Sequence, residues 1–108
     1  MKSIITSREK KLYERIIEEA TVDCYGSYEQ ISGWACLLDD CVPTPCNCTI
    51  GKEKAVLEKI DTDDNCNVLI GVIKLNKTKF RVLIQDVILD NQKAMNYINA
   101  YVYWCKEG

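Results

Sequence analysis

The stretch that decides the fold of the first half of this chain is Tyr25-Gly26-Ser27-Tyr28-Glu29-Gln30-Ile31-Ser32-Gly33-Trp34-Ala35-Cys36-Leu37-Leu38-Asp39-Asp40. Ser27 followed by Gln30 matches a capping box, so a helix is predicted to begin there. Ile31, Trp34 and Leu38 then fall on one face at helical spacing. The stretch therefore predicts a helix that packs one apolar stripe against a core.

The same stretch ends with two acids, Asp39 and Asp40, where the helix is predicted to stop. The helix macrodipole is negative at that end, and a carboxylate there costs about 0.3–1 kcal/mol. Free carbonyls at a helix C-terminus are oxygen donors that can join carboxylates around a cation. The pattern therefore indicates a cation site at this helix end.

Upstream of this stretch, an apolar stripe predicts another helix that begins near Ser7, its expected cap, and ends near Val22. Gly26 suits the turn between the two helices. A helical pair is thus expected over residues 7–41. The stripe consists of Tyr13, Ile16, Ile17 and Ala20.

The pattern changes after Pro43 and Pro45, which favour an extended segment. Short runs rich in β-branched residues follow, separated by turn-forming residues, and they predict an antiparallel meander, most simply a small barrel over residues 44–88. The expected strands are 46–50, 55–60, 68–75 and 80–84, joined by turns at 61–67 and 76–79.

A last helix is expected over residues 91–105, capped by Asp90 or Asn91. Its buried stripe serves core packing. The whole chain, residues 1–108, is therefore predicted to be a single α+β domain. The stripe consists of Ala94, Tyr97, Ile98, Tyr101, Trp104 and Cys105.

Composition excludes several classes of protein. The net charge is −2 over 108 residues, and the lysines are spread among acids, so a nucleic-acid partner is not expected. No apolar run approaches the roughly 18 residues of a membrane span, and the start lacks a signal-peptide layout. A cytoplasmic location with no membrane partner and with reduced thiols is therefore expected.

The chain has seven cysteines and no histidine. An odd number argues against a complete disulfide framework, and the spacings differ from the paired Cys-x2–4-Cys pattern of zinc sites. Buried free thiols are the simplest interpretation. The alternative is a zinc or redox module that would use Cys41, Cys46, Cys48 and Cys66.

Three motifs resemble the small calcium-binding proteins of the cyanobacterial CcbP family. The first is the run Tyr-Gly-x-x-Glu-Gln-x-x-Gly-Trp-x-x-x-Leu-Asp-Asp, continued by Val42-x-x-Pro45. The others are Arg15-Ile16-x-Glu18-Glu19-x-x-x-Asp23-x-Tyr25-Gly26 and Ala100-Tyr101-x-Tyr103-Trp104-x-x-x-Gly108. From Lys52 to Asp86 only the hydrophobic pattern matches. The resemblance implies an SH3-like barrel and a calcium site that includes the acidic pair.

The acidic pair departs slightly from the family motif. Relatives can have Glu where this chain has Asp39. Cys41 stands where relatives tend to have a polar residue, which makes the rim of the implied site less hydrophilic.

Acidic residues form three groups along the sequence, and Ca2+ takes six to eight oxygen ligands. Asp39 and Asp40 are the expected main ligands. The loop after residue 60 offers a second, weaker site. The predicted ligands of the second site are Asp61, Asp63, Asp64 and Asn65, and Glu18, Glu19, Asp23 and Glu29 could supplement either site.

The acidic loop of residues 61–67 is not an EF-hand. Asp61, Asp63 and Asn65 match positions one, three and five, but Cys66 replaces the Gly and Val72 the final Glu. Two interpretations stay open for this loop, a solvated hairpin connection and a weak calcium loop.

Catalysis is not expected, because the chain offers no histidine to activate a nucleophile and no Gly-rich phosphate loop. The sequence therefore predicts a cytoplasmic calcium buffer or sensor. The alternatives are the cysteine-based module and an interaction domain whose barrel binds a protein partner of unknown identity.

Overall fold

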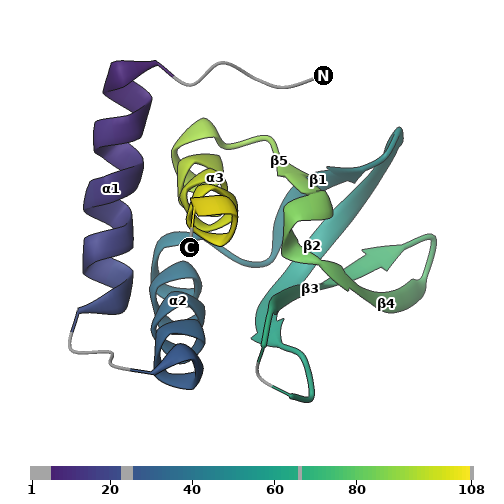
Figure 1. Cartoon of the computed structure of the whole chain (residues 1–108). Helices are drawn as coiled ribbons and strands as arrows, with labels where there is room; N and C mark the ends of the chain where they lie inside the picture. The colour runs from purple at the N-terminus through teal and green to yellow at the C-terminus, as the bar shows by residue number, and fades with distance from the viewer. Residues whose placement is uncertain (1–5, 23–25, 66, 108) are drawn as a thin grey trace.

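The computed structural model describes residues 6–22, 26–65 and 67–107. Within them lie three α-helices and five β-strands (Figure 1). The helices are α1 (Ser7–Thr21), α2 (Ser27–Cys41) and α3 (Gln92–Glu107). The strands are β1 (Cys46–Ile50), β2 (Glu53–Thr62), β3 (Leu69–Leu75), β4 (Thr78–Leu83) and β5 (Val87–Leu89), and the short 3-10 helix η1 (Ile84–Asp86) precedes β5.

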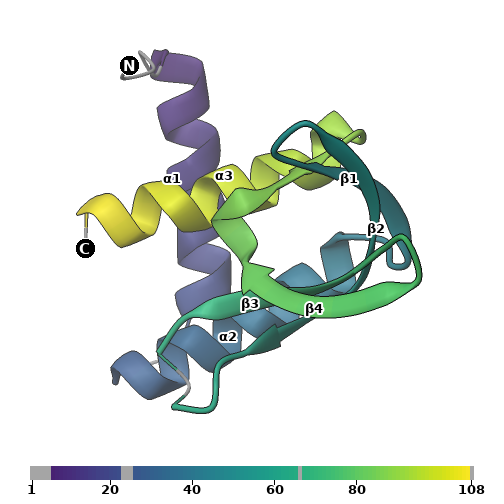
Figure 2. The ribbon, with the colours of Figure 1, turned by 90° about the vertical axis from the view of Figure 1, so that its right-hand side faces the viewer.

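The strands form one antiparallel sheet in the order β4-β3-β2-β1-β5. The α+β class is confirmed. The described part of the sheet curls but does not close into the expected barrel, since β4 and β5 are its two edges (Figure 2). The SH3-like description stays a prediction. The sequence missed β5, whose three residues are too few to produce a recognisable alternation.

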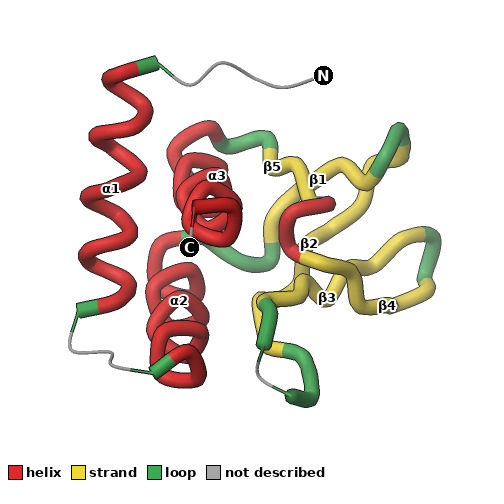
Figure 3. Tube along the Cα trace, viewed as in Figure 1, coloured by secondary structure: helices red, strands yellow, loops and turns green. Residues whose placement is uncertain are grey.

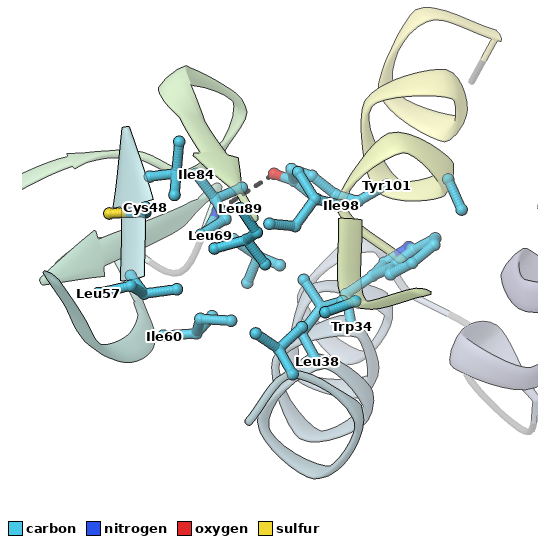
Figure 4. Packing of buried hydrophobic residues seen from close by; sticks show 14 of the residues in the cluster. Trp34, Leu38, Cys48, Leu57, Ile60, Leu69, Ile84, Leu89, Ile98 and Tyr101 are labelled. Carbon is cyan, nitrogen blue, oxygen red and sulfur yellow. Dashed lines mark hydrogen bonds between the residues drawn. The ribbon is translucent and has the colours of Figure 1, made fainter. Parts of the chain in front are cut away.

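The molecule is layered, with α1 on one side, α2 and α3 in the middle, and the sheet on the other side (Figures 1 and 3). One apolar core joins the helices to the sheet. Trp34, Leu38 and Tyr101 fill its centre and are at most 1% exposed. Figure 4 shows Trp34 and Leu38 of α2 facing Ile98 and Tyr101 of α3, with the strands beyond them. The predicted stripes of all three helices therefore contribute to this core. The exception is Cys105, which was predicted to be buried and is exposed in the last turn of α3.

The helix caps differ by one residue from two of the predictions. Thr6, and not Ser7, is the N-cap of α1, and it forms a reciprocal capping box with Glu9. The N-cap of α2 is Gly26, with no side-chain cap hydrogen bond, so the capping box predicted at Ser27 is wrong although the helix does begin there. Asn91 was one of two residues expected to cap α3, and its Oδ1 accepts a hydrogen bond from the Ala94 N–H at 3.2 Å.

The hairpin between β3 and β4 turns on two residues, Asn76 and Lys77, with φ of 50° and 71°. Positive φ at both central positions is the type I′ geometry, which matches the twist of the flanking strands.

No helix within the described residues is long and apolar enough to cross a membrane.

Candidate metal centre

The C-terminal end of α2 carries the two acids that the sequence singled out. Asp39 and Asp40 are exposed in the last turn, and that turn contains no basic residue. Leu38 and Val42 flank them and are fully buried, at 0% and 1% exposure. These apolar anchors hold the helix end against the core, while the carboxylates face solvent.

Backbone carbonyls supply further oxygen atoms at this helix end. The Val42 N–H closes the last turn by donating to the Leu38 carbonyl at 2.8 Å. The carbonyl of Asp39 would next accept from residue 43, but Pro43 has no N–H to donate. Past the end of the helix, Pro45 likewise has no N–H to donate to a nearby carbonyl. Carbonyl and carboxylate oxygens therefore occur together, as hard cations require.

The end of α2 is also close to α3 and α1. A hydrogen bond with the Cys41 thiol, followed by burial, raises the pKa of the Tyr97 hydroxyl. The negative charge of Glu19 raises this pKa further, and Arg15 opposes it. Glu19, in the last turns of α1, thus lies within electrostatic reach of the residue that contacts the end of α2.

The loop between β2 and β3 is organised by Asp63. Its Oδ1 accepts hydrogen bonds from the backbone N–H groups of Val68, at 3.1 Å, and Asn67, at 2.6 Å. These two bonds are the main reason why the pKa of Asp63 is lowered. This carboxylate therefore holds the loop closed, a role that the sequence prediction did not assign to it.

The other acids of this loop have basic neighbours. Asp61 Oδ2 lies 3.7 Å from Lys59 Nζ, and Asp64 Oδ1 lies 3.6 Å from Arg81 Nη1. Asp61 begins the turn but belongs to β2. Asn65 is exposed in the loop. A cation here would have to compete with these pairs.

The structure keeps the predicted acidic groups apart. The β2–β3 loop lies beside the N-terminal end of α2, and Asp39 and Asp40 belong to the opposite end (Figures 1 and 2). Glu29 is exposed in the first turn of α2, and Glu18 is exposed on α1. Asp23 lies outside the described residues. Among the residues that are described, no three acidic or thiol side chains come close enough to hold a metal ion.

The cysteines do not assemble into a thiolate site in the described part of the chain. Burial raises the pKa of both the Cys46 and the Cys48 thiols, which favours the neutral form that binds metals poorly. Cys48 is almost fully buried, and Cys66 lies outside the described residues.

The donor set therefore fits a hard, oxygen-seeking cation better than zinc. Two carboxylates and nearby carbonyls supply part of a six- to eight-oxygen shell, and water would complete it at so exposed a position. The prolines that leave carbonyls without donors were visible in the sequence as Pro43-x-Pro45, but their role emerged only once the last turn of α2 was located.

Comparison with known proteins agrees with this chemistry. Residues 14–105 match the model of the CcbP calcium-binding family, whose description is calcium binding. The chain therefore belongs to this family of calcium-binding proteins, and Ca2+ is the ligand of the class. A comparison with curated proteins finds no match.

Two solved structures share the fold. The crystal structure of CcbP from Anabaena has a TM-score of 0.76 at 20% identity, covering 97% of this chain and 95% of that chain. A calcium-binding protein in its calcium-binding form has a TM-score of 0.73 at 22% identity, covering 95% of this chain and 97% of the other. At this identity the likeness establishes the fold, and the ligand residues must be argued from this chain.

Proposed function

We propose that this protein binds Ca2+ at the C-terminal end of α2, through the carboxylates of Asp39 and Asp40 together with carbonyl oxygens of the last turn. The observation that carries the proposal is the pairing of two exposed acids with the helix end that least tolerates them, just before Pro43. A bound cation would remove their repulsion with the dipole. Glu19, and less directly Glu18, would add negative charge from α1.

The β2–β3 loop is proposed as a second, weaker site. Asp61, Asp64 and Asn65 would supply oxygen atoms there, with Glu29 or Asp23 as supplements. Asp63 already accepts two backbone hydrogen bonds. Its carboxylate would serve mainly to keep the loop closed while a cation binds beside it.

A buffer fits this arrangement better than a sensor. Sensors expose an apolar surface when Ca2+ binds. Here the apolar residues next to the site, Leu38 and Val42, are buried, and the carboxylates are already exposed, so binding requires no opening. The five cysteines that the structure describes are free thiols, which supports a reducing compartment such as the cytoplasm. An apolar-surface dye whose signal rises with Ca2+ would instead favour a sensor.

Calorimetric titration of chelator-treated, reduced protein with Ca2+, repeated in excess Mg2+, tests the proposal. Saturable binding that survives Mg2+ is expected. The variant Asp39→Asn with Asp40→Asn should weaken the tighter binding at least tenfold. Without Ca2+ this variant should melt at the same temperature or slightly higher, because two unfavourable charge–dipole interactions are removed.

Glu14→Gln is the matched control, since it removes one exposed acid of α1 that is not proposed as a ligand. It should leave Ca2+ binding unchanged. If the double variant binds Ca2+ as tightly as the parent, the assignment of Asp39 and Asp40 fails. Replacing Ca2+ by Zn2+ and counting reactive thiols examines the cysteine-based alternative, which predicts thiol protection by Zn2+.

A further inference from the structure

β4 is an edge strand with little cover. It pairs with β3 along one edge, and within the described residues no strand pairs with its other edge. Every residue of β4 except Val82 is exposed. Figure 2 shows β4 in front of the sheet with no helix across it. Its open backbone groups are available to pair with another chain.

Basic side chains gather on the outer face of the sheet at this edge. Ile73 is fully buried, so its neighbours on β3, Val72 and Lys74, point to the opposite face. Lys74 lies directly across from Lys79, and Val72 lies across from Arg81. On the other side Val72 also pairs with Lys59 of β2. We call these four residues the basic edge: Lys59, Lys74, Lys79 and Arg81.

Stability explains the basic edge only in part, since Arg81 Nη2 donates a hydrogen bond to the Thr62 carbonyl at 3.1 Å. Lys74 and Lys79 are like charges in direct cross-strand contact, which is a destabilising pair. Lys79 Nζ lies 3.0 Å from Glu58 Oε1, and Arg81 Nη1 lies 3.6 Å from Asp64 Oδ1. Such exposed ion pairs contribute little. The chain as a whole is acidic, with a net charge of −2, so this face departs from the rest of the molecule.

Large apolar side chains are exposed on the same strand. Phe80 is 36% exposed and Leu83 is 41% exposed, and both belong to β4. Together with the open backbone edge, they provide apolar contacts beside positive charge. This combination is what a bound extended peptide uses, with main-chain hydrogen bonds for affinity and alternate side chains for specificity.

We propose that β4 binds an extended acidic segment of a protein partner, which adds to the sheet as a sixth strand beside β4. Acidic side chains on one face of the segment would lie against Lys79 and Arg81. The alternate, apolar side chains of the segment would contact Phe80 from the other face. This site lies away from Asp39 and Asp40. It adjoins the proposed second calcium site, because Lys59 and Arg81 pair with Asp61 and Asp64.

Other occupants fit less well. A second copy pairing through β4 would bring Lys79 and Arg81 of one chain against the same residues of the other, which like-charge repulsion disfavours. A nucleic acid would gain from the lysines, but Glu58 and Asp64 lie within the cluster and would repel phosphates. A second copy would use the open backbone edge and Phe80 only against this repulsion, and a nucleic acid would not use the backbone edge.

Titration of the 15N-labelled 108-residue chain with a peptide tests the proposal. The probe is the acetylated hexapeptide Glu-Val-Glu-Val-Glu-Val, which matches the 6 residues of β4. Amide shifts should concentrate in residues 78–83 and saturate, with affinity that falls as salt rises. The matching Lys-Val hexapeptide should produce no such shifts. Absence of shifts, shifts elsewhere, or equal binding of both peptides would overturn the proposal, as would binding of oligothymidine alone.

A charge variant tests the role of the basic edge. Lys79→Thr with Arg81→Thr keeps β-forming residues and should weaken the Glu-Val peptide at least tenfold. Lys54→Thr is the control, an exposed β2 lysine that pairs with Thr49 near the other end of the sheet. It should bind as the parent does. Both variants should retain the parent circular dichroism spectrum, and undiminished binding by the double variant contradicts the proposal.

Discussion

Tyr101 shows how one side chain joins two elements. Its hydroxyl oxygen accepts a hydrogen bond from the Leu69 N–H at 3.1 Å, across the boundary between α3 and the sheet (Figure 4). Both residues are at most 1% exposed. The bond satisfies a buried amide at the start of β3, where the ladder with β2 begins.

The variant Tyr101→Phe should be destabilised because it leaves the buried Leu69 N–H without an acceptor. The expected loss in free energy of unfolding is about 1–3 kcal/mol, measured by urea denaturation. Tyr103→Phe is the control. The Tyr103 ring is only partly buried, so loss of its hydroxyl should lower the free energy of unfolding very little. Equal losses in the two variants would contradict this role for the Tyr101 hydroxyl.

The sequence predicted where individual residues lie better than it predicted what their side chains contact. Asp39 and Asp40 were located correctly at a helix end because dipole arguments need only local sequence. The prediction of Asp63 as a ligand stays a prediction. Its hydrogen bonds from the Asn67 and Val68 N–H groups could not be foreseen, because they depend on a turn geometry that composition does not specify. The pairing of Tyr101 with Leu69 is a contact between residues far apart in sequence, and no local pattern announces it.

At the scale of elements, the N-terminus of α1 depends on a reciprocal cap. The Thr6 Oγ1 accepts from the Glu9 N–H at 3.1 Å, and Glu9 Oε1 accepts from the Thr6 N–H at 3.2 Å. Thr6→Ala should therefore lower the free energy of unfolding by about 1 kcal/mol, measured by thermal or urea denaturation. Ser7→Ala, at the first helical position, should change it much less. The reverse order would mean that Ser7 is the functional cap.

The β3–β4 turn offers a stabilising substitution. Lys77 has a φ of 71°, a left-handed conformation that costs a residue with a Cβ roughly 1–2 kcal/mol. Lys77→Gly should remove that strain and raise the melting temperature in a calorimetric scan. Thr78→Gly, at the first residue of β4, should lower it, because glycine removes a side chain from the strand and adds flexibility. A melting temperature that falls in Lys77→Gly would contradict the argument.

The longer helices and strands could be predicted from the local sequence pattern. The three helices and β1 to β4 were predicted within a few residues, since apolar periodicity and turn residues marked them. β5 was missed, and the curled but open sheet was not foreseen. Both depend on how β1 pairs with a strand about forty positions along the chain, which periodicity does not report.

At the scale of the whole molecule, burial of tyrosines and thiols limits stability at high pH. Burial raises the pKa of Tyr101 to about 12, from 10.0, and the pKa values of Tyr13 and Tyr97 are raised as well. Burial also raises the pKa values of the Cys46 and Cys48 thiols above 9.0. The folded state therefore keeps protons that the unfolded chain releases.

The sign of the effect follows from proton linkage. Stability from these groups is fully present below about pH 9 and falls as pH rises through the unfolded pKa values of the thiols and then of the tyrosines. Melting temperatures should therefore decline from pH 9 to 11 in reduced protein. The decline should be shallower in Tyr101→Phe, relative to its own value at pH 8. A flat profile would contradict the assigned direction of these shifts.

The distribution of function over the molecule could be predicted only in part. The sequence predicts a cation site at Asp39 and Asp40, and it leaves two interpretations for the loop between β2 and β3. The structure shows that these two regions lie at opposite ends of α2. The basic edge could not be predicted from the sequence, because its residues come from three strands: Lys59, Lys74, Lys79 and Arg81. Only the ladder register brings them onto one face.

The aromatic cluster in the core has an optical consequence. The Trp34 ring lies 5.5 Å from that of Tyr101 and 5.8 Å from that of Trp104, and its indole Nε1 has no hydrogen-bond partner among the described residues. An indole so enclosed emits at short wavelength, and exposure to water shifts the emission to the red. The chain's own fluorescence can therefore report unfolding without a label, and Trp34 will report it at the junction of α2 and α3.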